Sequence, residues 1–121
     1  METKCVLTPV TEFTISRKMW LRGEGEVTSW LRRRSDGKMC CIGIYVKAMG
    51  ASDDDITDIK SVACLIDAGV DVPYWMDGRG FDHIIGRLYR NNDSLNLSPD
   101  ERERLITEGF AANSIKVTFI D

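Results

Sequence analysis

The sequence predicts an α+β fold: a small, mainly antiparallel sheet in which the N- and C-terminal strands pair, packed by three to four helices. Apolar and polar residues alternate near both ends of the chain, which is the pattern of half-buried strands. Between these ends, capping residues precede segments whose apolar residues recur at helical spacing. The chain of 121 residues has the usual size of one domain with one hydrophobic core, so we expect a single domain over residues 1–121.

The two expected strands cover residues 10–16 and 115–120. In the first, Phe13 and Ile15 alternate with hydroxyl-bearing residues, and threonine and phenylalanine favour extended backbone. In the second, Val117 and its apolar neighbours alternate with lysine and threonine. Pairing these two strands and packing the helices against them is the simplest architecture for this pattern.

Two alternatives remain open for residues 30–49. A turn is expected at Asp36, which is followed by glycine. The β-branched residues after this turn would fit a hairpin strand paired with residues 30–34. We favour a helix over about residues 38–49, because Gly50 suits a helix C-terminal cap.

The next helix is predicted to begin at Ser52 and to end at Gly69. The Ser52 hydroxyl can accept a backbone hydrogen bond, and the acidic residues that follow suit the positive end of the helix dipole. Capping therefore explains this acidic cluster better than a metal site does. The cluster also lacks the glycine and glutamate positions of a calcium-binding loop.

Two more helices are predicted in the C-terminal third of the chain. The apolar residues over 81–89 recur at the spacing of an amphipathic helix, and the two asparagines at positions 91 and 92 can end it. Ser98 can cap the last helix, with Pro99 in its first position and Glu101 completing a capping box.

The cysteines are expected to be reduced thiols, most of them serving as small core residues. The N-terminus shows no secretion signal, so we predict a cytoplasmic protein without disulfides. No stretch approaches the ~18 apolar residues that a membrane helix needs, so no membrane partner is expected. The four cysteines are Cys5, Cys40, Cys41 and Cys64.

One enzymatic hypothesis is a cysteine-dependent hydrolase or transferase. Cys40 or Cys41 would lie at the start of a predicted helix, where the helix dipole lowers a thiol pKa and favours the reactive thiolate. His83 is the only histidine and therefore the only candidate for an imidazole base. Its helix places it on the predicted polar face, so nothing in the sequence directs it towards either thiol.

The charges are distributed unevenly, and Arg32, Arg33 and Arg34 form a basic patch. Arginine binds phosphate with two hydrogen bonds and nearby tryptophans can stack on bases, so nucleic-acid binding is a second alternative function. The net charge of −3 argues against it, because nucleic-acid-binding domains are usually basic. The aspartates at 53–55 and 58 could equally form a second face that neutralises the arginines.

Aromatic residues beside arginines suggest a protein-binding surface instead. Trp30 precedes the Arg32–Arg34 patch, while Tyr74 and Trp75 precede a glycine-rich turn that contains Arg79. Aromatic and arginine side chains are enriched at the centres of protein interfaces. The sequence contains no paired cysteine or histidine motif and no phosphate-binding loop, so we expect no metal and no cofactor.

Several short segments of the chain together resemble small bacteriophage and bacterial proteins of unknown function. These segments are residues 16–23, 36–43, 92–93 with 98–103, and 115–119. No activity is attached to that group. The resemblance implies a phage or bacterial origin and a small protein that acts by binding. From the sequence we therefore expect a non-enzymatic binding protein, phage-encoded, whose partner is a host or bacterial protein.

Overall fold

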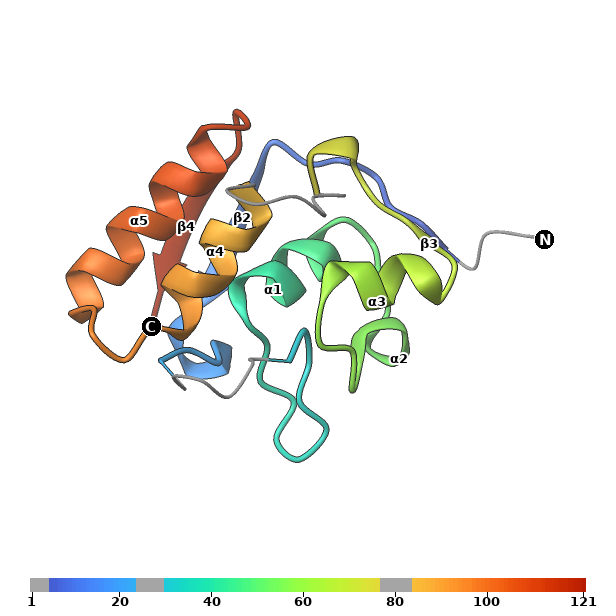
Figure 1. Ribbon diagram of the computed structural model, residues 1–121, viewed down its shortest axis with the longest axis horizontal. Helices are drawn as coiled ribbons and strands as arrows, with labels where there is room; N and C mark the ends of the chain where they lie inside the picture. The colour runs from blue at the N-terminus through green and yellow to red at the C-terminus, as the bar shows by residue number, and fades with distance from the viewer. Residues whose placement is uncertain (1–4, 24–29, 77–83) are drawn as a thin grey trace.

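The computed structural model describes residues 5–23, 30–76 and 84–121, and the side chains of Cys5, Val6, Tyr74 and Ile84 are not described. Helices and strands follow one another along the chain as drawn in Figure 1. In order they are β1 (Cys5–Val6), β2 (Glu12–Ser16), η1 (Arg17–Met19), α1 (Cys41–Ala48), α2 (Asp53–Ile56), α3 (Val62–Asp67), β3 (Val70–Asp71), η2 (Tyr74–Met76), α4 (Ile84–Asp93), α5 (Pro99–Ala111) and β4 (Lys116–Ile120). In these segments no helix is long and apolar enough to cross a membrane.

The predicted α+β class and the pairing of the terminal strands are confirmed. β2 pairs with β4 from Glu12 beside Lys116 to Ser16 beside Ile120. The strands run parallel, so the expected antiparallel direction is wrong. Alternation of apolar residues does not encode direction. Here the direction of β4 follows from the turn after α5, where Ser114 has a φ of 62° and the chain reverses along the helix. The short pair β1–β3 is also parallel.

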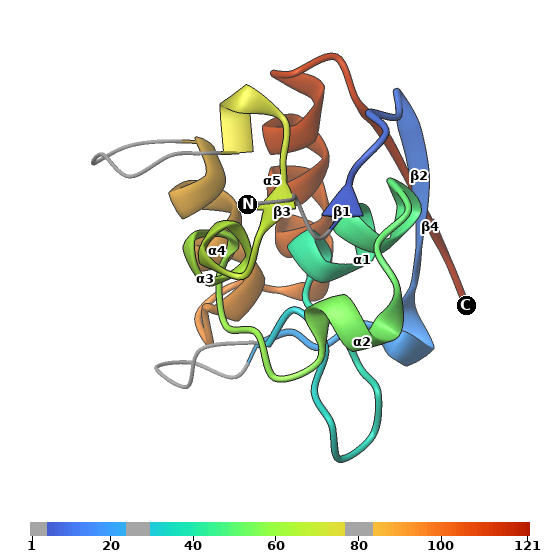
Figure 2. The same ribbon diagram turned by 90° about the vertical axis from the view of Figure 1, so that its right-hand side faces the viewer.

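The β2–β4 sheet covers one side of the molecule (Figure 2). Its inner face carries buried Phe13, Ile15 and Val117, whereas Glu12 and Lys116 are exposed on the outer face. The helices α1 and α5 contact the sheet, and α4 packs against both helices. Most buried apolar side chains join a single cluster, so these layers share one core.

Residues 41–48 form the helix α1, so the helix alternative is confirmed over the hairpin. Gly43 explains how α1 packs, because a Cβ atom there would lie 1.8 Å from the backbone oxygen of Leu31. The segment at Leu31 can therefore cross directly over the helix. Gly50, at a φ of 115°, follows α1 in the left-handed region that glycine tolerates.

The continuous helix predicted from Ser52 to Gly69 is wrong, because the chain breaks it into α2 and α3. The capping box at Ser52 is present, with the side chain of Asp55 as its second member. After α2, Asp58 adopts a φ of 65° and donates its backbone N–H to the oxygen of Arg32 at 3.0 Å. Ser61 then caps α3. Tertiary hydrogen bonds thus replace the helical hydrogen bonds that the periodicity predicted.

The two C-terminal helices form as expected and pack closely. Ser98 caps α5 by accepting a hydrogen bond from the backbone of Glu101 at 3.1 Å, and Pro99 occupies the first position; the return bond from the Glu101 side chain, which would complete the predicted capping box, is not formed. Gly109 of α5 faces Leu88 of α4, and a Cβ atom at Gly109 would lie 2.7 Å from that leucine side chain. The first residues of the predicted 81–89 helix lie outside the described residues.

α4 ends at Asp93, directly after the two asparagines predicted to end it, and the side chain of Asn92 is fully buried. Its side-chain amide connects α4 with the segment after η1 and with the start of α1. Its Oδ1 accepts hydrogen bonds from the indole N–H of Trp20 at 2.8 Å and from the backbone N–H of Cys41 at 3.0 Å. Its Nδ2 donates to the backbone oxygen of Leu21 at 2.9 Å. Because Cys40 supplies no side-chain cap, the amide of Asn92 caps α1 from another helix.

Arg102 of α5 supports the same region by capping the C-terminus of α4. Its guanidinium donates to the backbone oxygens of Asn91, Asn92 and Ser94 at 2.8, 2.9 and 2.7 Å. Burial lowers the pKa of Arg102, but arginine remains charged in proteins and therefore matches the negative end of the helix dipole.

We expect Asn92→Ala to destabilise the fold by about 2–4 kcal/mol, because it leaves buried donors of Trp20 and Cys41 without acceptors. Urea denaturation followed by tryptophan fluorescence measures this change. Asn96→Ala is the matched control, because Asn96 is exposed and should change stability by less than about 0.5 kcal/mol. Equal stability of the two variants would contradict the structural role given to Asn92.

Candidate partner-binding surface

Residues 31–38 form a turn that projects from the body of the molecule, seen at the bottom of Figures 1 and 2, and we call it the arginine turn. Its tip is closed by Gly37, at a φ of 75°, which donates its N–H to the oxygen of Arg33 at 2.7 Å. Its base is fixed by the N–H of Leu31, which donates to the oxygen of Ile59 at 2.8 Å. The three predicted arginines are therefore held on a backbone anchored at both ends.

Arg32 supports the turn from inside. Its Nη1 donates to the hydroxyl of Thr57 at 2.8 Å, and its Nε lies 3.7 Å from a carboxylate oxygen of Asp53. The guanidinium also lies against Gly37, where a Cβ atom would come within 3.1 Å of it. Arg32 is half-buried and has a structural explanation, so it offers little surface to a partner.

Arg33 and Asp36 close the turn with two hydrogen bonds. The guanidinium donates to both carboxylate oxygens of Asp36, at 3.2 and 2.7 Å. The backbone N–H of Lys38 donates to the same carboxylate at 3.1 Å. Together these donors, with Arg33 the larger influence, lower the pKa of Asp36 to about 2.

Arg34 is the most exposed of the three arginines. Its Nε donates to a carboxylate oxygen of Asp58 at 2.7 Å, while 74% of the arginine side chain remains accessible. An exposed ion pair of this kind contributes only about 0–1 kcal/mol, so a partner's carboxylate can replace Asp58 at low cost. Arg34 is therefore the cation of the turn that is best placed for intermolecular contact.

Trp30 lies at the base of the arginine turn, half-buried. The ammonium of Lys60 stands 5.1 Å from the centre of its ring. The backbone oxygen of Trp30 accepts a hydrogen bond from Cys40 at 3.1 Å, which ties the base of the turn to the start of α1. The structure thus brings Trp30 and the three arginines to one end of the molecule.

The second predicted aromatic segment lies at the other end of the molecule, where η2 is drawn in Figures 1 and 2. Trp75 is half-buried, and its ring contacts those of Tyr45 and Phe110 at centroid distances of 5.8 and 6.1 Å. Its indole therefore contributes to core packing. Arg79 and the side chain of Tyr74 lie outside the described residues.

The two candidate nucleophiles, Cys40 and Cys41, are completely buried at the start of α1. Burial raises the pKa of Cys40 to about 12 and that of Cys41 well above its usual range. The helix N-terminus lies where the sequence predicted it, but desolvation outweighs its effect on both thiols. His83 lies outside the described residues. Neutral, inaccessible thiols in the core disfavour a nucleophilic role.

The sequence does not predict two residues that contact the side chains of this region. Asp58 pairs with Arg34 across 24 positions, and Lys60 covers Trp30 across a comparable separation. The only sequence feature that points to these contacts is the uneven charge distribution. It suggests that the basic and acidic clusters neutralise each other, but it does not indicate which residues form pairs. The geometry shows that the arginines face Asp53, Asp36 and Asp58.

Comparison with models of known protein families, with curated proteins and with solved structures found no match. The fold alone therefore gives the class of this protein: it is an α+β protein with a projecting turn whose arginines form ion pairs.

We expect iodoacetamide to alkylate Cys64, which is exposed, and to leave Cys40 and Cys41 unmodified in the folded protein at neutral pH. Burial blocks access to both core thiols and keeps them protonated. Peptide mass spectrometry identifies the modified positions, and denaturant serves as the positive control in which both core thiols react. Rapid alkylation of Cys40 or Cys41 without denaturant would restore the thiol-enzyme hypothesis.

We expect the carboxyl group of Asp36 to titrate near pH 2. The ¹³C chemical shift of this carboxyl group, measured as a function of pH, tests the prediction. Because this folded-state pKa is depressed, the ion pair contributes stability above the ordinary pKa of 3.8, and that contribution is lost as the pH falls through about 2. Arg33→Ala should return the pKa of Asp36 towards 3.8, whereas Arg104→Ala on α5 should not change it. If the pKa of Asp36 in Arg33→Ala were the same as in wild type, Arg33 would not be the group that stabilises the carboxylate.

Proposed function

We propose that this chain is a non-enzymatic binding protein that binds a host or bacterial protein through the arginine turn and Trp30. The observation that supports the proposal best is the accessible guanidinium of Arg34, which is presented on an anchored turn and held by an exposed ion pair with Asp58. The phage or bacterial origin in this proposal comes from the sequence resemblance alone.

The charge pattern of the turn favours a protein partner over a nucleic acid. Each of the three arginines has a carboxylate within 4.0 Å, so the surface alternates between positive and negative groups. A phosphate backbone would be repelled by these carboxylates, whereas a protein surface can present an acidic group to Arg34 and a basic group to Asp58. Exchange of ion pairs would then replace the intramolecular contact.

The rigidity of the turn also supports recognition. Its backbone is fixed at the tip by Gly37 and at the base by Leu31, so little conformational entropy is lost when a partner binds. Trp30 beside Lys60 adds an aromatic surface next to the charged tip. Aromatic and arginine side chains in such a position are the residue types that dominate binding energy at protein interfaces.

The test is capture of partners from bacterial lysate by the tagged protein, with and without nuclease, comparing wild type with Arg34→Glu. We expect a nuclease-resistant protein partner that Arg34→Glu retains about tenfold less, because the variant places a carboxylate beside Asp58. Arg104→Glu is the matched control, since Arg104 is also exposed and also forms an ion pair, with Glu108 on α5.

Mass spectrometry identifies the captured protein, and titration with the purified partner then compares the affinities of wild type and the two variants. Thermal unfolding establishes that both variants are folded. Loss of all partners on nuclease treatment would favour nucleic-acid binding, and equal retention by Arg34→Glu and wild type would exclude the arginine turn as the binding surface.

A further inference from the structure

β4 is a strand with one unpaired edge. β2 occupies one side of it, and within the described part of the chain no strand pairs with the other side. The N–H of Lys116 donates to the oxygen of Thr11, so Lys116 faces β2 with its backbone. Because backbone groups alternate along a strand, those of Val117 and Phe119 face the opposite edge. An unpaired edge of this kind is a template for another strand.

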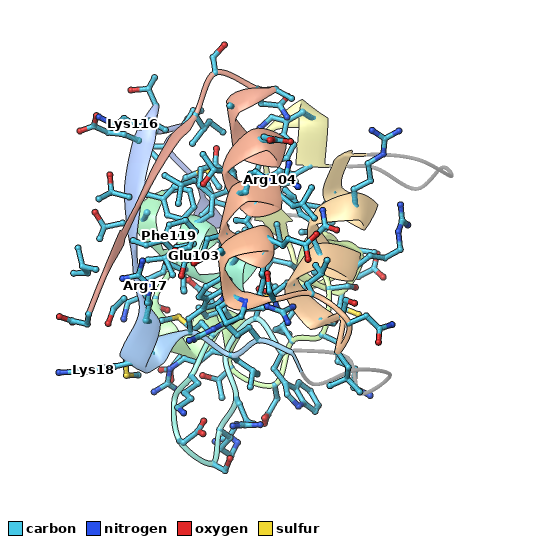
Figure 3. The ribbon with its side chains drawn as sticks, turned by 90° about the vertical axis from the view of Figure 1, so that its left-hand side faces the viewer. Arg17, Lys18, Glu103, Arg104, Lys116 and Phe119 are labelled. Atoms are coloured by element: carbon cyan, nitrogen blue, oxygen red, sulfur yellow. The ribbon has the colours of Figure 1, made fainter. Side chains whose placement is uncertain are left out.

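The surface is hollow beside the start of this edge, whereas further along it Arg17, bonded to Glu103 of α5 at 2.7 Å, lies over the ring of Phe119. A hollow of about 310 Å³ lies between the C-terminal half of α5 and the start of β4, lined by Thr11, Thr107, Ala111, Ser114, Ile115, Lys116 and Val117. Figure 3 shows β4 running alongside α5, with Lys116 near its start and Phe119 between the strand and the helix. A second strand could therefore approach the start of β4 next to α5.

The outer face of β4 carries an apolar side chain that the fold leaves uncovered. Ile120 is 46% exposed and is one of three large exposed hydrophobic side chains among the described residues. Thr118 and Lys116 are exposed on the same face. The outer face of β2, by contrast, carries only Glu12, Thr14 and Ser16. The apolar surface that a partner strand would cover therefore lies on β4.

We propose that the open edge of β4 binds β4 of a second copy of this chain, antiparallel, with the two-fold axis at Thr118. In this register Val117 lies opposite Phe119 of the second copy, and their outward backbone groups can hydrogen-bond. The resulting sheet would have four strands, with β2 of each copy at its outer edges.

The side-chain pattern of β4 is self-complementary in this register. Thr118 lies opposite its own copy, and threonine pairs across antiparallel strands are favourable. Lys116 lies opposite Ile120 of the second copy, so its aliphatic stem can cover the exposed isoleucine while its ammonium remains in water. No two like charges face each other in this register. A two-fold interface requires a surface that is complementary to itself, and β4 meets this requirement.

The inference is independent of the proposed function, because β4 contributes no residue to the arginine turn. The contact would consist of one short strand and the adjoining part of α5, which places it at the small end of stable interfaces. We therefore expect a dimer that dissociates on dilution.

The test is sedimentation equilibrium of wild type, Thr118→Lys, Thr118→Glu and Thr14→Lys over a concentration series up to about 1 mM. Wild type should dimerise, and each Thr118 variant should dimerise at least about tenfold more weakly, because two like charges then meet at the axis. An equimolar mixture of Thr118→Lys and Thr118→Glu should recover the dimer. Thr14→Lys is the matched control, since Thr14 is the register partner of Thr118 on β2 and is also exposed.

A wild-type chain that stays monomeric over the whole series would overturn the inference and leave the proposed function untouched. A dimer that Thr14→Lys weakens and Thr118→Lys does not would place the contact on β2 and would equally overturn it. Circular dichroism of all four proteins separates loss of pairing from loss of folding.

Discussion

The packing of this protein depends on the hydrogen bonds made by the buried side-chain amide of Asn92. A buried donor or acceptor without a partner costs about 1–3 kcal/mol, and Asn92 satisfies three such groups from two separate segments at once. It accepts from the indole of Trp20 and from the N-terminus of α1 at Cys41, and it donates to Leu21. Arg102 then neutralises the carbonyls at the C-terminus of the helix that carries it. Because each of these contacts is directional, α4, α5, α1 and the segment after η1 have one mutual arrangement.

The arrangement of these helices determines the position of the arginine turn. Once α1 is fixed, Gly43 allows the chain at Leu31 to cross directly over it. The backbone of Leu31 and Arg32 is then bonded to the segment between α2 and α3, at Ile59 and Asp58. The same contacts break the helix that the sequence predicted there and bring the acidic and basic clusters face to face. The turn consequently combines a fixed backbone with an accessible tip, and the proposed function depends on this combination.

The two proposed contact surfaces differ in what they would use for binding. The arginine turn presents side-chain charge, which is screened by salt and exchangeable between partners. The open edge of β4 presents backbone hydrogen-bonding groups next to an exposed isoleucine. Binding at one surface uses no residue of the other, so a dimer formed through β4 would leave Arg34 in its intramolecular pair with Asp58.

The sequence by itself determined the local features of this protein. The alternation at Phe13, Ile15 and Val117 encodes which face of each strand is buried, and Ser52 and Ser98 encode where two helices begin, because both signals act within a few residues. The tertiary structure alone decided the parallel direction of β4, the break at Asp58 and the central role of Asn92. Each of these depends on contacts between residues far apart in the chain. The candidate site divides in the same way: the arginines were evident, but the pairing of Arg34 with Asp58 and the burial of Cys40 and Cys41 follow only from how the helices pack.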